Sequence, residues 1–304
     1  MVIERQSHRT RGTNMTTAPF STSALSAHHG MVIERGHLPL TELPHADIAD
    51  LFKIHGTLLF RGFEASAEDF RGLVQRFSST LYFHQNPNRE TLSDDGAVLL
   101  VDAHRNPIPA HAEMSYCPLH PGLQWFFCVQ PAGSGGATTV YDGVEAYNRL
   151  AKETRDLFDE HRLTWRLPFP TGPEHQERVF GTSDRGELEA MFADYEDFTY
   201  EFDESGNLNW NYTVSAVPQA PYVDARTLCN SYLGSGAIVA FEDGSPIPQH
   251  CRWDALDATE QVAVDIEWQA GDIVMIDNRR VMHGRRGFED PNRKVAAMLS
   301  RPNF

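Results

Sequence analysis

The stretch that decides the fold and the site is HAEMSY, residues 111–116, in which His111 and Glu113 stand two positions apart. Along an extended strand alternate side chains point to the same side, so both can reach one metal ion while Ala112 points away. The chain has 14 His, and a His-x-Glu pair also arises by chance. The pair is therefore weak evidence until a third ligand is found.

A third ligand is expected at His283, in the second half of the chain. Residues 268–278, WQAGDIVMIDN, predict a Gly-Asp turn and a buried apolar strand, and His283 follows shortly after. Arg293 then leads a further strand, KVAAML (294–299). Two histidines and one carboxylate can occupy one face of an octahedral Fe(II) and leave the other face open, as in non-heme iron oxygenases. The sequence predicts such a site.

The chain resembles the Fe(II)- and 2-oxoglutarate-dependent dioxygenases of the taurine dioxygenase (TauD/TfdA) family. It is most similar to the branch with SyrP-like and clavaminate-synthase-like proteins, which His-x-Glu in place of His-x-Asp also fits. The resemblance covers roughly residues 38–301 and keeps the family's order. It is carried by LLFRGF (58–63), HAEMSY (111–116), FFC (126–128) leading to GGAT (135–138), FEDGSPI (241–247), WQAGD (268–272), and DN to HGR (277–285).

The resemblance implies a double-stranded β-helix (jelly roll) that uses Fe(II), the co-substrate 2-oxoglutarate and O2. It assigns the distal carboxylate of 2-oxoglutarate to Arg293, because a planar guanidinium can donate two parallel hydrogen bonds to it. Thr138 is expected to bind the same carboxylate, although an ordinary strand threonine is an equal alternative. The other candidates for these two roles are Arg285, Arg286, Arg301 and Thr139.

The resemblance also implies the type of reaction. We expect hydroxylation of an aliphatic carbon in a small amino-acid-like, peptide or carrier-protein-bound substrate, in specialised metabolism. Desaturation, cyclisation and epoxidation are the alternatives. Related halogenases have a small residue where the metal carboxylate would be, so Glu113 argues against halogenation. A zinc hydrolase would be expected to show a His-Glu-x-x-His helix, and a non-catalytic jelly-roll binding protein would not need the intact triad.

Hydrophobic periodicity predicts one mainly β domain with flanking helices over residues 31–304. The expected helices are 47–55, 66–77 with a capping box at Ser66 and Asp69, 142–161 and 253–261; the expected strands include 57–60, 98–102, 123–129 and 262–268. MVIER at residues 1–5 recurs at 31–35. We expect residues 1–30 to be a flexible tail, for which an upstream start codon is one explanation.

Residues 163–235 are rich in Pro, Gly and aromatic side chains, and they predict an irregular, lid-like insertion between the two halves of the site. Its candidate substrate-binding residues are Trp165, Trp210, Asn211, Tyr212 and Arg226. The alternative, that these aromatics only pack the lid onto the sheet, carries at least equal weight for each one.

Composition narrows the class of protein. With 304 residues, 41% of them hydrophobic, the chain can bury one large core. The net charge of −16 argues against a nucleic-acid partner, and it reflects solubility more than a cationic substrate. No apolar run reaches membrane-spanning length. The four Cys lack Cys-x-x-Cys spacing and suggest reduced thiols in a cytoplasmic protein. A homo-oligomer is left open.

Overall fold

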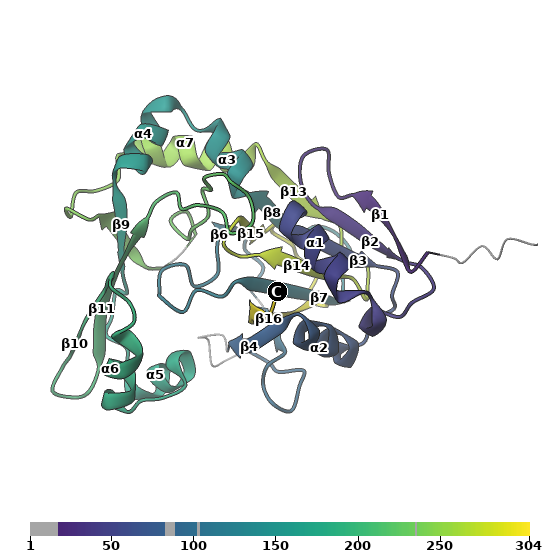
Figure 1. Ribbon diagram of the computed structural model, residues 1–304, viewed down its shortest axis with the longest axis horizontal. Helices are drawn as coiled ribbons and strands as arrows, with labels where there is room; N and C mark the ends of the chain where they lie inside the picture. Colours follow the sequence, from purple (N-terminus) through teal and green to yellow (C-terminus); the bar gives the residue numbers. More distant parts are fainter. Residues whose placement is uncertain (1–17, 83–88, 102–103, 235) are drawn as a thin grey trace, which may run out of the picture.

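The body of the protein is formed by two β-sheets packed face to face, with a third sheet standing beside them (Figure 1). This computed structural model describes residues 18–82, 89–101, 104–234 and 236–304. The predicted class, mainly β with flanking helices, is confirmed. The double-stranded β-helix remains our interpretation of how the two body sheets are connected.

The larger body sheet has eight strands in the order β1-β2-β3-β14-β7-β16-β4, with β5 paired to β16. Their bounds are β1 Phe20–Ala24, β2 Met31–Arg35, β3 Thr57–Arg61, β4 Ser78–Tyr82, β5 Leu99–Leu100, β7 Leu123–Gln130, β14 Ile273–Asp277 and β16 Lys294–Pro302. The central strands are mainly apolar, because both faces of the sheet are covered.

Two helices cover the outer face of this sheet, α1 (His45–His55) and α2 (Ala67–Arg76). The predicted capping box is confirmed: the Ser66 hydroxyl accepts from the backbone N–H of Asp69, whose carboxylate accepts from that of Ser66. The apolar side of α2 packs on the sheet, where the rings of Phe70 and Phe127 stack 5.3 Å apart.

The smaller body sheet, which we call the site sheet, has the order β13-β8-β15-β6. Its strands are β6 Ile108–His111, β8 Thr138–Asp142, β13 Ala263–Ile266 and β15 Val281–Arg285. Val140 and Val281 of the site sheet belong to one buried cluster with Phe126 and Val274 of the larger sheet. This packing places the inner face of β15 against the core.

Two helical predictions need correction. The single helix expected over residues 142–161 is two helices, α3 (Gly143–Arg149) and α4 (Lys152–Glu160), because the backbone is extended at Leu150 and Ala151. The helix expected at 253–261 starts earlier, as α7 (Gln249–Glu260). These three helices lie together at the top of Figure 1.

The insertion at 163–235 is a folded unit, and the prediction that it is irregular was wrong. It contains three strands of a sheet ordered β10-β11-β9-β12, together with α5 and α6. Its elements are β9 Arg162–Arg166, α5 Pro173–Phe180, α6 Arg185–Phe192, β10 Phe198–Phe202 and β11 Leu208–Ser215; β12 Ile238–Phe241 comes from beyond it. The strands are short and separated by Pro and Gly, so the sequence shows no clear alternation of hydrophobic and polar residues there.

The tail predicted for residues 1–30 is also wrong over its last part. β1 pairs antiparallel with β2, and His29, which is 6% exposed, enters the core. One ring nitrogen of His29 lies 3.1 Å from the carboxylate of Asp142 and the other 2.7 Å from the Thr57 hydroxyl. Residues 1–17 lie outside the described residues.

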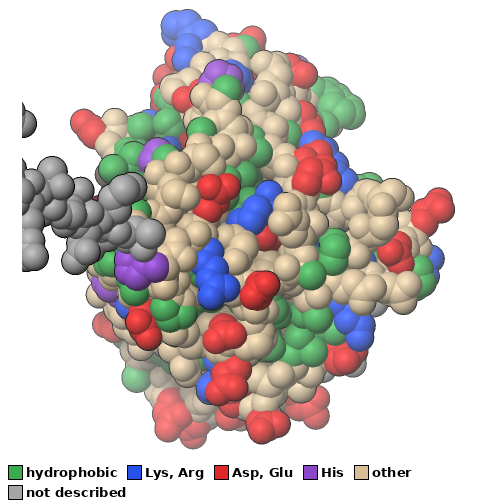
Figure 2. Space-filling model, turned by 90° about the vertical axis from the view of Figure 1, so that its right-hand side faces the viewer, with side chains coloured by type: hydrophobic (Ala, Val, Ile, Leu, Met, Phe, Trp, Pro, Cys, Tyr) green, Lys and Arg blue, Asp and Glu red, His purple; other side chains and the backbone are tan. Residues whose placement is uncertain are grey.

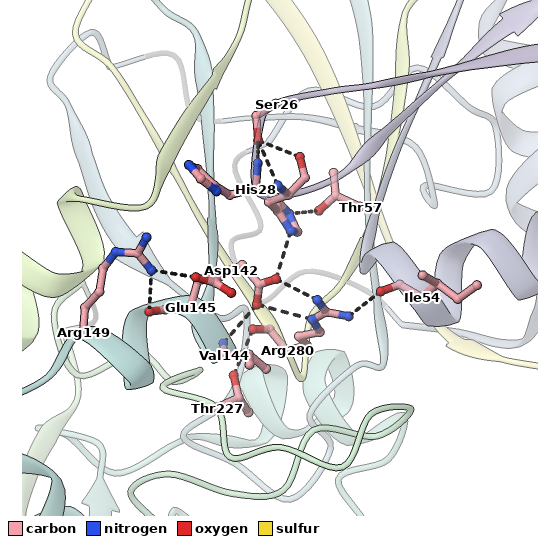
Figure 3. A network of polar contacts seen from close by, with 11 residues as sticks. Ser26, His28, Ile54, Thr57, Asp142, Val144, Glu145, Arg149, Thr227 and Arg280 are labelled. Carbon is pink, nitrogen blue, oxygen red and sulfur yellow. Dashed lines mark hydrogen bonds and ion pairs between the residues drawn. The ribbon is translucent and has the colours of Figure 1, made fainter.

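Asp142 is the centre of this buried network (Figure 3). Its carboxylate accepts from Arg280, with Nη2 at 2.7 Å, and from the backbone N–H of Val144. Burial would raise the pKa of Asp142, but the hydrogen bonds and charges of His29 and Arg280 hold it well below its usual range. The network therefore fastens the N-terminal hairpin to the site sheet.

We predict that His29→Ala lowers the free energy of unfolding by about 1–3 kcal/mol, because it leaves buried partners unsatisfied. Urea unfolding measures the change. His28→Ala is the control, since that neighbouring side chain is exposed, and it is expected to stay within about 0.5 kcal/mol of the unchanged protein. Equal stabilities of the two variants would contradict the role given to His29.

The surface agrees with the acidic composition. On the face shown in Figure 2, acidic side chains are spread widely and basic ones stand between them. The absence of a nucleic-acid partner stays a prediction. Within the described residues, the structure contains no helix that is both long and apolar enough to cross a membrane.

Candidate metal centre

The two histidines of the predicted triad face each other across a strand pair. His111 ends β6 and is the direct register partner of His283 in β15. Side chains of partnered residues lie on the same face of a sheet, and the two imidazole rings are 4.3 Å apart. The site sheet thus brings together residues that are far apart in the sequence.

Glu113 completes the triad from outside the strand. The ligand atoms of His111, Glu113 and His283 all lie within 4.8 Å of one another, and Nε2 of His111 is 3.8 Å from Oε2 of Glu113. β6 ends at His111, so the predicted i, i+2 alternation along a strand is not what aims the carboxylate. Glu113 instead lies in the turn that follows, before Met114 with its left-handed φ of 57°.

Hydrogen bonding prepares His111 to bind a metal ion. Its Nδ1 lies 3.0 Å from the carbonyl oxygen of Pro109. A carbonyl can only accept, so Nδ1 carries the proton and Nε2 faces Glu113. Burial lowers the pKa of His111, whereas the hydrogen bond and charge of Glu113 raise it, and the net shift is upward. The raised pKa shows that the Glu113 carboxylate stabilises positive charge next to it, as it would stabilise a bound metal ion.

His283 is suited to the same role. Burial and the charge of His111 hold its pKa well below the usual value, so the ring is neutral, the form that binds metals. Its Nδ1 is buried with no hydrogen-bond partner among the described residues. An unpaired buried polar atom is costly unless a ligand or water completes it. Two imidazoles and one carboxylate with such an atom fit a divalent transition metal.

The triad opens into a cavity of about 570 Å³. Arg293 and Thr138 both line it, as predicted for the 2-oxoglutarate site. Nε of Arg293 donates to the carbonyl of Gly136 at 2.8 Å, and a Cβ on Gly136 would come within 2.8 Å of the Arg293 side chain. The glycine therefore leaves room for the guanidinium. Burial, with the charge of Arg285, lowers the pKa of Arg293 to about 10, so it is charged at neutral pH.

The structure separates the alternatives for these two roles. Arg286 forms ion pairs with Asp265 and Glu260, and Arg301 is exposed; neither lines the cavity. Arg285 does line it, but its guanidinium donates to the carbonyl oxygen of Asn106 at 2.8 Å. Of the three arginines predicted as alternatives to Arg293, Arg285 is therefore the one that lines the cavity.

Thr139 and Thr138 point to different places. The Thr139 hydroxyl donates to Asp265, at 2.6 Å, away from the cavity. The Thr138 hydroxyl accepts from the indole N–H of Trp268 at 3.1 Å, which leaves its own proton available to an acceptor in the cavity. The geometry thus favours Thr138 over Thr139 as the residue that binds the distal carboxylate of 2-oxoglutarate.

The five predicted substrate residues do not line this cavity, and their role in substrate binding stays a prediction. Trp165 is fully buried, and Trp210 is 6% exposed; each packs in a hydrophobic core, and Tyr212 packs against the same core as Trp210. Asn211 and Trp210 line a separate hollow on the insertion. Arg226 pairs with Asp159 at 3.6 Å. The insertion reaches the cavity through Leu167, Pro168, Ser231 and Gly234.

Further residues around the triad were not predicted from the sequence. Arg89, Tyr82 and Tyr116 line the cavity. Tyr116 is the last residue of HAEMSY (111–116), so its closeness in sequence to His111 and Glu113 could have indicated a place in the cavity. Arg89 follows a segment without periodicity, and nothing in the sequence marked it. The side chain of Asn278 also contacts the Glu113 backbone, at 2.8 Å.

Comparison with known proteins agrees with this geometry. The sequence model of the family described as taurine catabolism dioxygenase TauD, TfdA family, matches residues 21–299. A clavaminate synthase-like protein of Arabidopsis thaliana is 27% identical over 80% of this chain and 81% of its own.

Solved structures share the fold. A taurine dioxygenase from Burkholderia xenovorans superposes with a TM-score of 0.66 at 15% identity, covering 94% of this chain and 90% of that one. PvcB, described as an Fe, alpha-ketoglutarate dependent oxygenase from an isonitrile synthetic pathway, gives 0.61 at 18%, covering 97% and 95%. The chain belongs to the TauD/TfdA family and is a non-heme iron dioxygenase that uses Fe(II), 2-oxoglutarate and O2.

Proposed function

We propose that His111, Glu113 and His283 hold Fe(II), and that Arg293 with Thr138 binds the distal carboxylate of 2-oxoglutarate. The observation that carries the proposal is the convergence of three ligand atoms within 4.8 Å at a cavity of about 570 Å³. Three protein ligands leave three positions of an octahedral ion open. When bound, the metal and co-substrate activate O2 for oxidation of a C–H bond, with release of succinate and CO2.

The residues of the chain position the reactants. Arg293 offers a half-buried cation beside Gly136, in the lining that also contains Thr138, so it orients the co-substrate by its distal carboxylate. Leu99, Leu167 and Leu299 form apolar walls that exclude water from the reacting carbon. Residues 163–235 act as the lid, through the loop at Leu167.

We infer hydroxylation of an aliphatic carbon as the outcome, in a small amino-acid-like, peptide or carrier-bound substrate of specialised metabolism. Glu113 occupies the place that a halide would need. PvcB, a structural relative described as an oxygenase from an isonitrile synthetic pathway, supports specialised metabolism. Desaturation, cyclisation or epoxidation would use the same site.

A substrate screen tests the reaction. Candidates are incubated with Fe(II), 2-oxoglutarate and O2, succinate is quantified, and products are weighed by mass spectrometry. We expect one substrate to give a product heavier by one oxygen, with one succinate for each product. Loss of two hydrogens would instead support desaturation or ring closure. A chlorinated product in high chloride would contradict the role of Glu113 as a ligand.

A further inference from the structure

The direction of the Glu113 carboxylate is not explained by the strand that precedes it. β6 ends at His111, two residues earlier. Met114, directly after Glu113, is in the left-handed region with a φ of 57°, which is uncommon for a residue other than glycine. A turn of this kind persists only when surrounding contacts fix it. Some other part of the protein must therefore hold the peptide groups of Glu113.

Those contacts come from the side chain of Asn278. Its Oδ1 accepts from the backbone N–H of Glu113 at 2.8 Å, and its Nδ2 donates to the backbone carbonyl of Glu113 at 2.8 Å. Nδ2 also donates to the carbonyl of Pro121 at 2.9 Å. A single amide thus satisfies both backbone groups of the proposed ligand.

Asn278 is itself held rigidly. It is fully buried, its backbone N–H donates to Gly122 at 3.1 Å, and its carbonyl accepts from Nε2 of His120 at 2.9 Å. It directly follows β14, in the turn that leads into β15 and His283. The same residue therefore connects the segment that bears the carboxylate to the strand that bears the distal histidine.

We propose that Asn278 is the positioning residue of the metal centre: its amide fixes the Glu113 backbone relative to β15, so that Glu113 and His283 converge on one ion. The inference rests on the proposed function, because it takes these residues to be ligands. Partners that orient a metal ligand typically contribute 10–100-fold to metal affinity or activity. Without the amide, the turn at Glu113 loses two fixed hydrogen bonds and the carboxylate samples other directions.

The test compares Asn278→Asp with Gln176→Glu. Gln176, in α5, is 1% exposed, and its Nε2 donates to the carbonyls of Thr171 at 2.7 Å and Gly206 at 2.8 Å. Both substitutions replace an amide NH2 that serves two backbone carbonyls by an oxygen that repels them. Both should therefore lower the melting temperature of the metal-free protein, but only Asn278→Asp acts on Glu113.

Binding of Mn(II), a redox-stable substitute for Fe(II), is measured by calorimetry. We expect the dissociation constant of Asn278→Asp to rise about 10–100-fold, and that of Gln176→Glu to stay within about twofold of the unchanged protein, as for a site without contact to the ligands. In metal-free Asn278→Ala, hydrogen exchange of the Glu113 amide should also accelerate, because its acceptor is gone.

The outcomes separate the two proposals. Equal Mn(II) affinities of Asn278→Asp and Gln176→Glu would overturn the positioning role. If Asn278→Asp does not fold, an Asn278→Ala protein with unchanged Mn(II) affinity has the same consequence. Failure of the unchanged protein to bind Mn(II), or undiminished binding by His283→Ala, would instead overturn the metal site itself.

Discussion

Replacing His283 by alanine is expected to abolish both Fe(II) retention and 2-oxoglutarate turnover. The ring supplies one of three protein ligands, its register partner is His111, and no further His, Cys, Asp or Glu joins this cluster among the described residues. Iron per chain is measured after anaerobic reconstitution and desalting, and succinate after addition of O2. His111→Ala should behave in the same way, because it removes the facing ligand.

His29→Ala is the matched control, since it also removes a buried histidine. The His29 ring bonds to Asp142 of the site sheet and to Thr57, and these hydrogen bonds involve no member of the triad. It should retain iron at a temperature where it is folded. An active, iron-loaded His283→Ala protein would show that the distal ligand lies elsewhere.

Replacing Arg293 by alanine should raise the apparent constant for 2-oxoglutarate well over tenfold while iron binding is retained. Removing one partner of a buried charge pair costs about 2–5 kcal/mol, which includes the unpaired carboxylate that is left, and 1.4 kcal/mol corresponds to a factor of ten. Since the pKa of Arg293 is about 10, the guanidinium stays charged below that pH, so its contribution should be constant from pH 6 to 8. Initial rates over a range of 2-oxoglutarate concentrations measure the effect.

Two other arginines sharpen this test. Arg286→Ala should leave the constant nearly unchanged, because Arg286 pairs with Asp265 and Glu260 outside the cavity. Arg285→Ala addresses the predicted alternative that lines the same cavity. A large increase for Arg285→Ala combined with none for Arg293→Ala would move the co-substrate site to Arg285.

The sequence predicted those parts of the site that depend on local pattern. β7 and β14 are mainly apolar, and His283 follows β14 closely, so the position of the distal histidine could be inferred without coordinates. The convergence of His111 with His283 could be predicted by assuming that their two strands are neighbours in a sheet. The aim of Glu113 could not be inferred, because it depends on a side chain 165 positions away, that of Asn278.

The insertion shows why the sequence could not place the five predicted substrate residues relative to the cavity. Trp165 and Trp210 are large aromatics in a segment expected to cover the cavity, but each packs in a core that the segment shares with the rest of the chain. Trp165 lies in a cluster with Tyr141 and Met282 of the site sheet, and Trp210 in one with Cys117 and Leu299. Composition indicates that aromatics must be buried somewhere, and it does not indicate in which core. The N-terminal hairpin was missed for a similar reason: β1, FSTSA, has little apolar character, and its place is fixed by pairing with β2 and by His29.

The most direct test of the central claim is a crystal structure of the protein with Mn(II) and N-oxalylglycine, an analogue of 2-oxoglutarate, with anomalous scattering recorded for manganese. We expect one anomalous peak per chain, within bonding distance of His111, Glu113 and His283, and the distal carboxylate of the analogue on Arg293. A peak elsewhere, or a peak at the triad that lacks Glu113 or His283 as a ligand, would contradict it.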